Sequence, residues 1–184
     1  MRYFNKLAGT QCYLSPINVE DAETYAAWLN DPEIARSLLM TADSISLVTQ
    51  RQRLEELAAG HLYSVVNLAT DTVIGSAGLK DIDNLHRTCL ISVFIGEKEL
   101  WGQGYGAEAM RLLLGYAFDH LNLHSVRLTV FAFNSRAIAL YRRLGFKEAG
   151  RWRDGLRREG RFHDVILMDI LENEFRAASV PAGT

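Results

Sequence analysis

Apolar residues recur along the chain at two spacings, and together they predict an alternation of strands and helices. Short apolar or alternating runs predict strands at residues 11–17, 63–69, 73–79, 89–95, 126–133, 147–152 and 164–171. Apolar positions at helical spacing predict helices at residues 22–29, 46–59, 107–121 and 135–144. The run at residues 89–95 is nearly continuous, which is typical of a strand covered on both faces.

Capping residues mark several of these boundaries. Asn18 and Asn134 stand where the first and last helices begin, and their amide oxygens suit N-caps. Gly60 and Gly145 follow two helices and act as stop signals. The resulting order is strand, two helices, three strands, helix, strand, helix and a final strand pair, which we expect to form a hairpin. This order predicts a mixed α/β (α+β) sheet, since a doubly wound parallel fold would alternate more strictly.

Length and composition narrow the class of protein. The 184 residues suit one domain, which we expect over residues 1–176, followed by a flexible tail over residues 177–184. The net charge of -2 gives no general attraction to nucleic acid or anionic membrane. No apolar run reaches the roughly 18 residues of a membrane span, and the N-terminus lacks the apolar core of a signal peptide.

The two cysteines bear on the compartment. Cys12 and Cys89 lie in apolar, strand-like contexts, so we expect reduced and buried thiols, with a disulfide as the alternative. The chain is therefore expected in the cytoplasm, without metal, nucleic acid or membrane as partners.

Three glycines alternate directly before a helical pattern: Gly102, Gly104 and Gly106. The bare backbone of such a loop can bind a phosphate at a helix N-terminus. The Lys-Ser/Thr ending of a P-loop is missing, which disfavours nucleotide hydrolysis. The loop also lies mid-chain, with no acidic residue about 20 positions later, which disfavours a dinucleotide fingerprint. Taken alone, the loop is either a phosphate cradle or a tight turn between strand and helix.

A second segment gives the loop a narrower meaning. It runs from Asn134 to Phe146 and contains Asn-x-x-Ala, then Tyr141, then Gly-Phe. With the Trp-Gly-x-Gly-Tyr-Gly form of the loop and a Gly-Arg-Phe-x-Asp turn at residues 160–164, the chain resembles the GNAT superfamily of acetyl-coenzyme A-dependent N-acetyltransferases, and within it the RimJ/RimL type. The resemblance covers residues 13–175. It implies a mixed, mostly antiparallel central sheet of about seven strands flanked by about four helices.

The resemblance also assigns roles to individual residues. The signature loop would hold the pyrophosphate of acetyl-CoA through backbone amides, and the end of the preceding strand would pair with the pantetheine arm. Trp101 departs from the usual Gln or Arg, which removes a side-chain donor but leaves the backbone cradle. Asn134 would contact the arm, and Tyr141 would act near the thioester sulfur as a general acid. The expected cofactor-binding residues are Val93, Phe94, Ile95, Trp101, Gly102, Gln103, Gly104, Tyr105, Gly106 and Asn134, and the expected catalytic residue is Tyr141.

Simpler roles stay open for two of these residues, and the general base is missing. Tyr141 could pack as an aromatic against the sheet, and Asn134 could be a helix cap alone. Where relatives carry a glutamate, this chain has Thr129 on one strand and residues 88–90, Thr-Cys-Leu, on another. At pH 7 an α-amine is roughly 10% neutral and a lysine-like amine only about 0.04%, so a weak base suits an amine of low pKa. Candidate proton relays are Asp81, Asp83, His86 and Ser92.

The acceptor side shows a cluster of arginines. Arg151, Arg153, Arg157, Arg158 and Arg161 have only Asp154 and Glu159 between them, and His163 follows. In relatives this hairpin lines the acceptor cleft, so a basic hairpin would repel polyamines and favour an anionic acceptor. A solvated hairpin with scattered ion pairs is the alternative. Opposite it, Leu38, Leu39 and Met40 line a cleft or fill the core.

These inferences predict an N-acetyltransferase that moves the acetyl group of acetyl-CoA directly to a primary amine in a ternary complex. Neither cysteine has an activating motif, so no acyl-enzyme is expected. The acceptor is a protein or peptide N-terminal α-amine, a nucleotide-linked amino sugar or a polyamine, since residues 86–88 also resemble spermidine acetyltransferases. A non-catalytic acyl-CoA-binding module is the alternative of another class. The family is also compatible with a homodimer.

Overall fold

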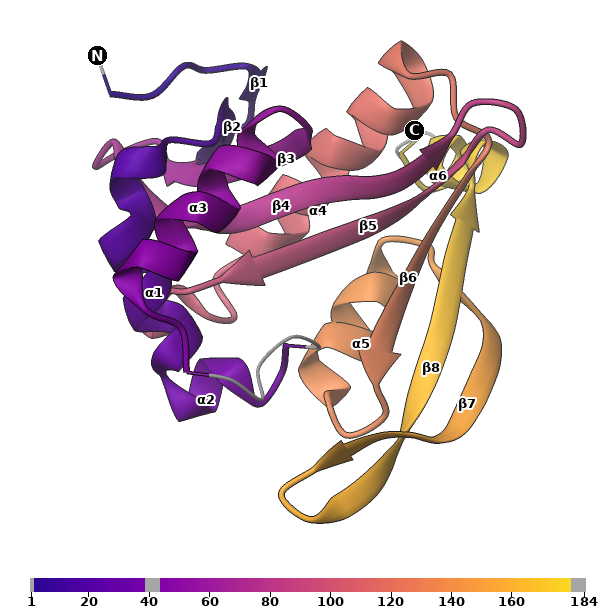
Figure 1. The fold of residues 1–184 in the computed structure, drawn as a ribbon. Coiled ribbons are helices and arrows are strands. Elements are labelled where there is room, and N and C mark those ends of the chain that lie inside the picture. Colours follow the sequence, from indigo (N-terminus) through magenta and orange to yellow (C-terminus); the bar gives the residue numbers. More distant parts are fainter. Residues whose placement is uncertain (1, 39–43, 180–184) are drawn as a thin grey trace. The chain divides into compact units, whose positions relative to one another are not determined.

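Eight strands form one sheet among the described residues, which are 2–38 and 44–179 of this computed structural model. Their order is β1-β2-β3-β4-β5-β6-β8-β7 (Figure 1). The strands are β1 (Leu7–Ala8), β2 (Cys12–Pro16), β3 (His61–Asn67), β4 (Thr72–Asp83), β5 (Thr88–Ile95), β6 (Ser125–Phe131), β7 (Lys147–Arg158) and β8 (Arg161–Leu171). Strands β5 and β6 pair in parallel, whereas β1–β2, β2–β3, β3–β4, β6–β8 and β7–β8 are antiparallel. The predicted mixed, mostly antiparallel sheet is confirmed, with the short β1 as an added strand.

The helices follow the predicted pattern with two additions. They are α1 (Ala22–Asn30), α2 (Pro32–Ala35), α3 (Leu47–Ala58), α4 (Tyr105–Gly115), α5 (Ser135–Arg143) and α6 (Glu172–Ser179). Short 3₁₀ turns cover Val19–Asp21 and Lys98–Leu100, and a π-helical turn, Tyr116–His120, continues α4. Helices α2 and α6 were not expected. Residues 177–179 of the expected tail belong to α6, while residues 180–184, like Leu39 and Met40, lie outside the described residues.

Side-chain caps mark where several of these helical segments begin. The Asn18 side chain accepts from the N–H of Glu20, and the Ser46 hydroxyl accepts from that of Thr49. The Asn134 side chain accepts from the third residue of α5 at 3.1 Å. Each cap satisfies an N–H that has no partner inside its helix, so local sequence alone fixes these starts.

The chain divides into two compact units. Unit 1 comprises Met1–Leu79 and Ser92–Leu113, and unit 2 comprises Lys80–Ile91 and Leu114–Thr184. Strands β4 and β5 and helix α4 each run from one unit into the other. The single domain expected over residues 1–176 therefore stays a prediction.

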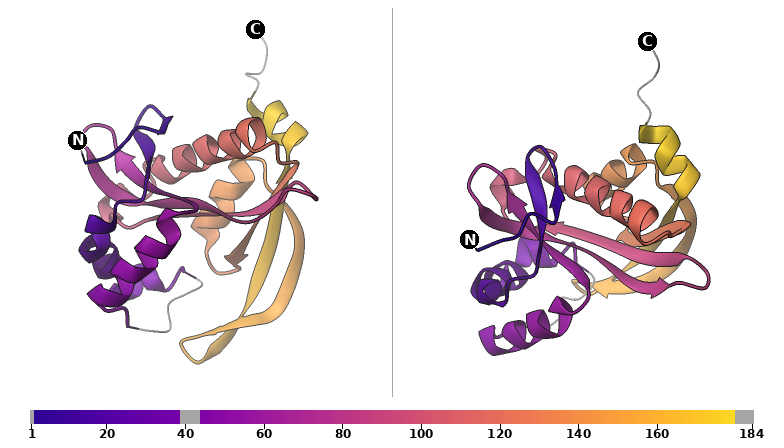
Figure 2. Two further views of the ribbon diagram at one scale, coloured as in Figure 1. Left: turned by 45° about the horizontal axis from the view of Figure 1, so that its top comes forward. Right: turned by 90° about the horizontal axis from the view of Figure 1, so that it is seen from above.

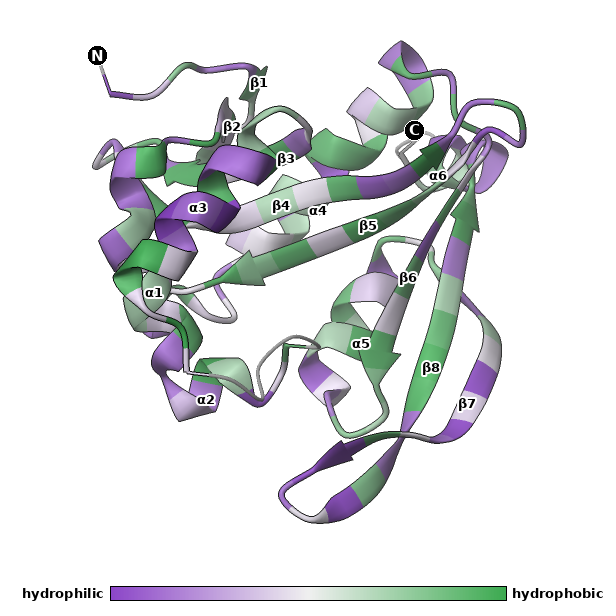
Figure 3. Ribbon diagram, viewed as in Figure 1, coloured by the Kyte–Doolittle hydropathy of each residue, from purple (hydrophilic) through white to green (hydrophobic). Residues whose placement is uncertain are grey.

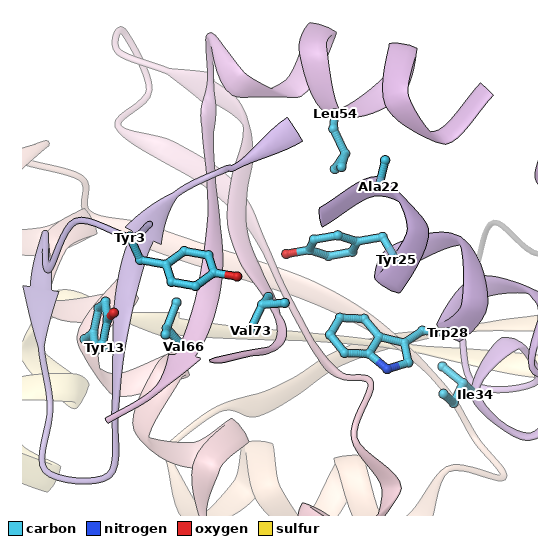
Figure 4. Close-up of a cluster of buried hydrophobic side chains, with 9 residues drawn as sticks. All are labelled: Tyr3, Tyr13, Ala22, Tyr25, Trp28, Ile34, Leu54, Val66 and Val73. Atoms are coloured by element: carbon cyan, nitrogen blue, oxygen red, sulfur yellow. The ribbon is translucent and has the colours of Figure 1, made fainter. Parts of the chain in front are cut away.

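Unit 1 has a core rich in aromatic side chains (Figure 4). Its helices α1 and α3 lie on one side of its strands and α4 on the other (Figure 2). Tyr25 and Trp28 of α1 meet edge to face at 5.3 Å, and both contact the ring of Phe94 near the end of β5, at 6.3 and 5.7 Å. The Tyr25 hydroxyl also donates to the carbonyl of Gly75 at 3.0 Å. Helix α1 is thus fixed to the segment of β5 that precedes the glycine loop.

Unit 2 buries one face of its strands. Val126, Leu128 and Val130 of β6 are buried, and the residues between them are exposed. Strand β8 is largely hydrophobic, whereas its neighbour β7 is mostly hydrophilic (Figure 3). The expectation that β5 is covered on both faces was wrong, because Cys89 and Ile91 are buried while Leu90 lines an open cleft on the other face.

We expect Gly75→Ala to lower the free energy of unfolding by about 1–3 kcal/mol, because overpacking moves the backbone. A Cβ at Gly75 would lie 2.1 Å from the Phe94 carbonyl oxygen and 2.9 Å from the Ile95 Cα. Urea unfolding followed by circular dichroism measures the change. Gly150→Ala in β7 is the control, since a Cβ there meets nothing within 4 Å. Equal effects of the two substitutions would contradict the close approach of β4 and β5.

Candidate functional site

The glycine loop has a backbone that favours glycine at two positions. Gly102 and Gly104 have φ angles of 81° and 98°, in the left-handed region where a side chain is strained. A Cβ at Gly102 would meet nothing within 4 Å, so the requirement there is purely conformational. Left-handed residues in such a turn can direct successive N–H groups to one side, which forms a concave anion-binding nest.

Helix α4 begins directly after this turn. The carbonyl of Gly104 accepts the first helical hydrogen bond, from the N–H of Glu108 at 3.0 Å. The N–H groups of the preceding helical residues, 105–107, have no partner within the helix, and the helix dipole makes this end positive. The loop and helix together therefore suit the phosphates of acetyl-CoA.

Two side chains of the loop hold its shape. The indole N–H of Trp101 donates to the carbonyl of Ile95 at 2.8 Å, and the ring packs against the aromatic core of unit 1. The side-chain amide of Gln103 donates to the carbonyl of Glu99 at 2.6 Å. Trp101 thus uses its single side-chain donor within the protein and Gln103 uses one of its two, and we expect both residues to serve a ligand through the backbone.

The end of β5 is fixed against β4. The N–H of Gly96 donates to the carbonyl of Ile74 at 2.8 Å, and Phe94 packs into the core. Val93, Phe94 and Ile95 are each partly exposed. Their pairing with the pantetheine arm stays a prediction, and the Ile95 carbonyl already accepts the Trp101 indole.

Glu108 is a residue that sequence reasoning missed. Its carboxylate accepts four hydrogen bonds from the turn between β1 and β2: two from Thr10 and one each from the N–H groups of Gln11 and Cys12, at 2.6–2.8 Å. Burial alone would raise its pKa, but these four donors outweigh burial and lower the pKa of Glu108 to about 2. Its partners lie 96–98 residues away in sequence, so no local pattern reveals them.

The two other predicted residues lie in unit 2, both at α5. Asn134 caps α5 through its side-chain oxygen, which accepts a hydrogen bond from the N–H of Ala137. Its side-chain N–H₂ group takes no part in this capping bond. Tyr141 is 9% exposed, its ring lies 5.9 Å from that of Phe146, and its hydroxyl has no hydrogen-bond partner among the described residues. Burial raises the pKa of Tyr141 to about 12, so the phenol keeps its proton at neutral pH. Asn134 thus serves as a helix cap and Tyr141 as a buried aromatic that packs on Phe146, while the cofactor-binding role of Asn134 and the catalytic role of Tyr141 stay predictions.

The other reactive groups are less suited to chemistry. Cys12 and Cys89 are free and buried as predicted, and burial raises the pKa of their thiols to about 12 and about 11. Asp83 accepts the N–H of His86 in the turn after β4, which holds its pKa below the ordinary value. Ser92 is exposed on β5. Among residues 2–38 and 44–179, no group of His, Cys, Asp and Glu could hold a metal ion.

The arginine hairpin of β7 and β8 is partly neutralised. Arg151 pairs with Asp164 at 3.2 Å and with Glu148 at 3.6 Å. Arg157 lies over the exposed ring of Phe162, 5.9 Å from its centroid. The hairpin therefore contains both ion pairs and exposed guanidinium groups. It has features of the basic hairpin and of the solvated, ion-paired hairpin that the sequence left open.

A family model supplies the identification. Residues 11–147 match the model described as the acetyltransferase (GNAT) domain. The chain belongs to the GNAT acetyltransferase family. It is therefore an acetyl-CoA-dependent N-acyltransferase, with acetyl-CoA as its co-substrate.

Similar proteins carry names with different acceptors. The chain is 29% identical to the putative ribosomal N-acetyltransferase YdaF of Bacillus subtilis, over 88% of this chain and 86% of that protein. It is 33% identical to a spermidine N(1)-acetyltransferase of Vibrio cholerae, over 66% of this chain and 73% of that protein.

Solved structures agree with the fold. The crystal structure of spermidine N-acetyltransferase from Vibrio cholerae, in complex with CoA and spermine, has a TM-score of 0.83. That match is 24% identical and covers 91% of this chain and 99% of the other, so it supports the GNAT fold. Among the described residues, no helix is both long enough and apolar enough to cross a membrane.

We expect Glu108→Gln to lower the free energy of unfolding by about 1–3 kcal/mol at pH 7, because it weakens charge-assisted hydrogen bonds. The folded pKa of about 2 lies below the ordinary value of 4.5. The contribution of the carboxylate is therefore full above pH 4.5 and is lost as the pH falls toward 2. Urea unfolding at pH 7, 5 and 3 should show the difference from wild type shrinking with the pH.

The matched control is Glu55→Gln on the exposed side of α3, which should change the free energy of unfolding by less than about 0.5 kcal/mol. A difference between wild type and Glu108→Gln that stays constant from pH 7 to pH 3 would contradict the role of the Glu108 charge.

Proposed function

We propose that this GNAT protein transfers the acetyl group of acetyl-CoA to an N-terminal α-amine of a protein or peptide, as the RimJ/RimL resemblance implies. The observation that best supports acetyl-CoA binding at this loop is the pair of left-handed glycines, Gly102 and Gly104, directly before α4. This backbone would hold the pyrophosphate, with Trp101 and Gln103 keeping the loop in shape.

On this proposal, Tyr141 acts at the departing sulfur. Bound acetyl-CoA supplies a thioester whose acetyl group forms an amide with a neutral amine, while the carbon–sulfur bond breaks. The Tyr141 phenol is protonated at neutral pH and can donate a hydrogen bond or its proton to the sulfur. Asn134 would contact the pantetheine arm through the N–H₂ group that its capping bond leaves unused.

The choice of an α-amine rests on proton chemistry. The positions that carry a glutamate in relatives hold Thr129 and residues 88–90, and no carboxylate replaces them there. An α-amine has a far larger neutral fraction at pH 7 than a lysine-like amine, so it needs less help from a base. The exposed arginines of the hairpin would favour a peptide with acidic residues after its first position.

A polyamine is the second candidate acceptor, favoured by the 33% identity to a spermidine N(1)-acetyltransferase. The exposed arginines of the hairpin would repel a polycation, although the charge of Arg151 is balanced by ion pairs with Glu148 and Asp164. A nucleotide-linked amino sugar remains a further alternative. The cytoplasmic location and the homodimer drawn from the sequence also stay predictions.

An acceptor screen tests the proposal. Release of free CoA thiol from acetyl-CoA would be followed with a peptide that begins with a free α-amine and continues with acidic residues, and with spermidine. We expect kcat/KM to be at least about tenfold higher for the peptide, a difference of about 1.4 kcal/mol. The same peptide with a blocked N-terminus is the control and should release no thiol.

The screen also separates the alternatives. Faster thiol release with spermidine than with the peptide would assign the polyamine as acceptor. Thermal stabilisation by acetyl-CoA without thiol release on any amine would instead indicate a binding module.

We expect Tyr141→Phe to lower kcat about 100-fold, because proton transfer by a side chain contributes at least this much. The dissociation constant for CoA should stay within about twofold, since the ring and its packing remain. Steady-state kinetics and titration calorimetry measure the two quantities. Tyr116→Phe, in the π-helical turn that follows α4, is the matched control and should leave both values unchanged. Unchanged turnover of Tyr141→Phe would remove Tyr141 as the general acid.

A further inference from the structure

The turn between β1 and β2 is built around the carboxylate of Glu108. Four donors from Thr10, Gln11 and Cys12 reach its two oxygens. Gly9 is required at the start of this turn, because a Cβ there would lie 2.5 Å from the Cys12 carbonyl oxygen and 2.7 Å from the Glu108 carboxyl carbon. The backbone of the turn is therefore held closely against the first turn of α4.

This arrangement places Gln11 beside the glycine loop. The side-chain nitrogen of Gln11 lies 3.3 Å from the position that a Cβ on Gly104 would occupy. Its backbone is anchored on both sides, since its N–H donates to Glu108 at 2.8 Å and its carbonyl accepts from Leu68 at 2.9 Å. The side chain is exposed and has no hydrogen-bond partner among the described residues.

We propose that Gln11 is a cofactor-binding residue whose side-chain amide donates a hydrogen bond to the pyrophosphate of acetyl-CoA, and that Glu108 is a positioning residue that holds Gln11 at the glycine loop. The inference rests on the proposed function, in which that loop holds the pyrophosphate. A neutral amide with two N–H donors suits a phosphate oxygen in a nest already formed by backbone amides. An anchored backbone also reduces the entropy lost when the contact forms.

The orientation of Glu108 supports this division of roles. A carboxylate in the first turn of a helix is favoured by the helix dipole, but beside a phosphate it would repel the ligand. Here both carboxylate oxygens face the β1–β2 turn and accept hydrogen bonds from it. The charge therefore organises the turn, and the neutral side chain of Gln11 lies at the loop.

The first experiment tests Gln11 through the part of the cofactor that it contacts. Gln11→Ala should lower kcat/KM about 10- to 100-fold with acetyl-CoA, a range consistent with the loss of one hydrogen bond to a charged group. S-acetylpantetheine, which lacks the pyrophosphate, should react equally well with the variant and with wild type. Gln11→Glu should weaken CoA binding more than Gln11→Ala, because it places a negative charge at the phosphates. Gln52→Ala, at an exposed position of α3, is the matched control and should leave kcat/KM unchanged with both acetyl-CoA and S-acetylpantetheine.

The second experiment tests Glu108 by a double-mutant cycle in CoA binding, measured by titration calorimetry. Glu108→Gln should weaken binding about 5- to 20-fold in wild type but less than about twofold in the Gln11→Ala background, because coupled residues are not additive. Equal effects in both backgrounds would mean that Glu108 does not act through Gln11. Gln11→Ala changes an exposed side chain, so its result stands even if Glu108→Gln fails to fold.

The outcomes separate this inference from the proposed function. If wild type neither binds CoA nor releases thiol from acetyl-CoA, the proposed function fails. If wild type does both, and Gln11→Ala and Gln11→Glu bind CoA as wild type does, the role of Gln11 is overturned while the proposed function stands. If Gln11→Ala lowered kcat/KM equally with acetyl-CoA and with S-acetylpantetheine, the role of Gln11 would also be overturned, because its contact would then not involve the pyrophosphate.

Discussion

The carboxylate of Glu108 joins two segments that are 96–98 residues apart in sequence. Its four hydrogen bonds fasten the turn between β1 and β2 to the first turn of α4, and β1 is only two residues long. Such a short edge strand has little stability of its own, so the carboxylate contributes much of what holds this turn in place. The Glu108 carboxylate therefore couples the N-terminal edge of the sheet to the start of α4.

The glycine loop illustrates a general difficulty of phosphate binding by backbone. Glycine gives access to left-handed conformations but raises the entropy lost on ordering. The structure offsets this with side chains on either side: the Trp101 indole bonds the end of β5, the Gln103 amide bonds Glu99, and Glu108 anchors the far side. All three use side-chain atoms for the scaffold. The backbone N–H groups at the start of α4 remain available to a ligand, and the loop is ordered before the ligand arrives.

Sequence reasoning succeeded where the physical cause is local. Caps such as Asn134, a turn at the glycine loop and the periodic strands follow from neighbouring residues, and the structure confirms these local elements. It failed where the cause is long-range. The partners of Glu108 come from the other end of unit 1. The pairing of Arg151 with Asp164 arises where the register of β7 and β8 shifts, which the sequence does not reveal. An apolar run such as residues 89–95 fits a half-covered strand as well as a fully covered one.

On the proposed function, Tyr141 bears on why transfer to an α-amine would not require a carboxylate base. Amide formation removes one proton from the amine nitrogen, and the departing thiol gains one, so the proton count balances once the amine is neutral. A separate base is needed only to deprotonate an ammonium group. Burial raises the pKa of Tyr141 to about 12, so its phenol is protonated at neutral pH and can donate a hydrogen bond or its proton to a developing thiolate. With a low-pKa α-amine, the proposed site needs a donor at sulfur more than a base at nitrogen, and Tyr141, which is buried and protonated on α5, is the residue proposed to supply it.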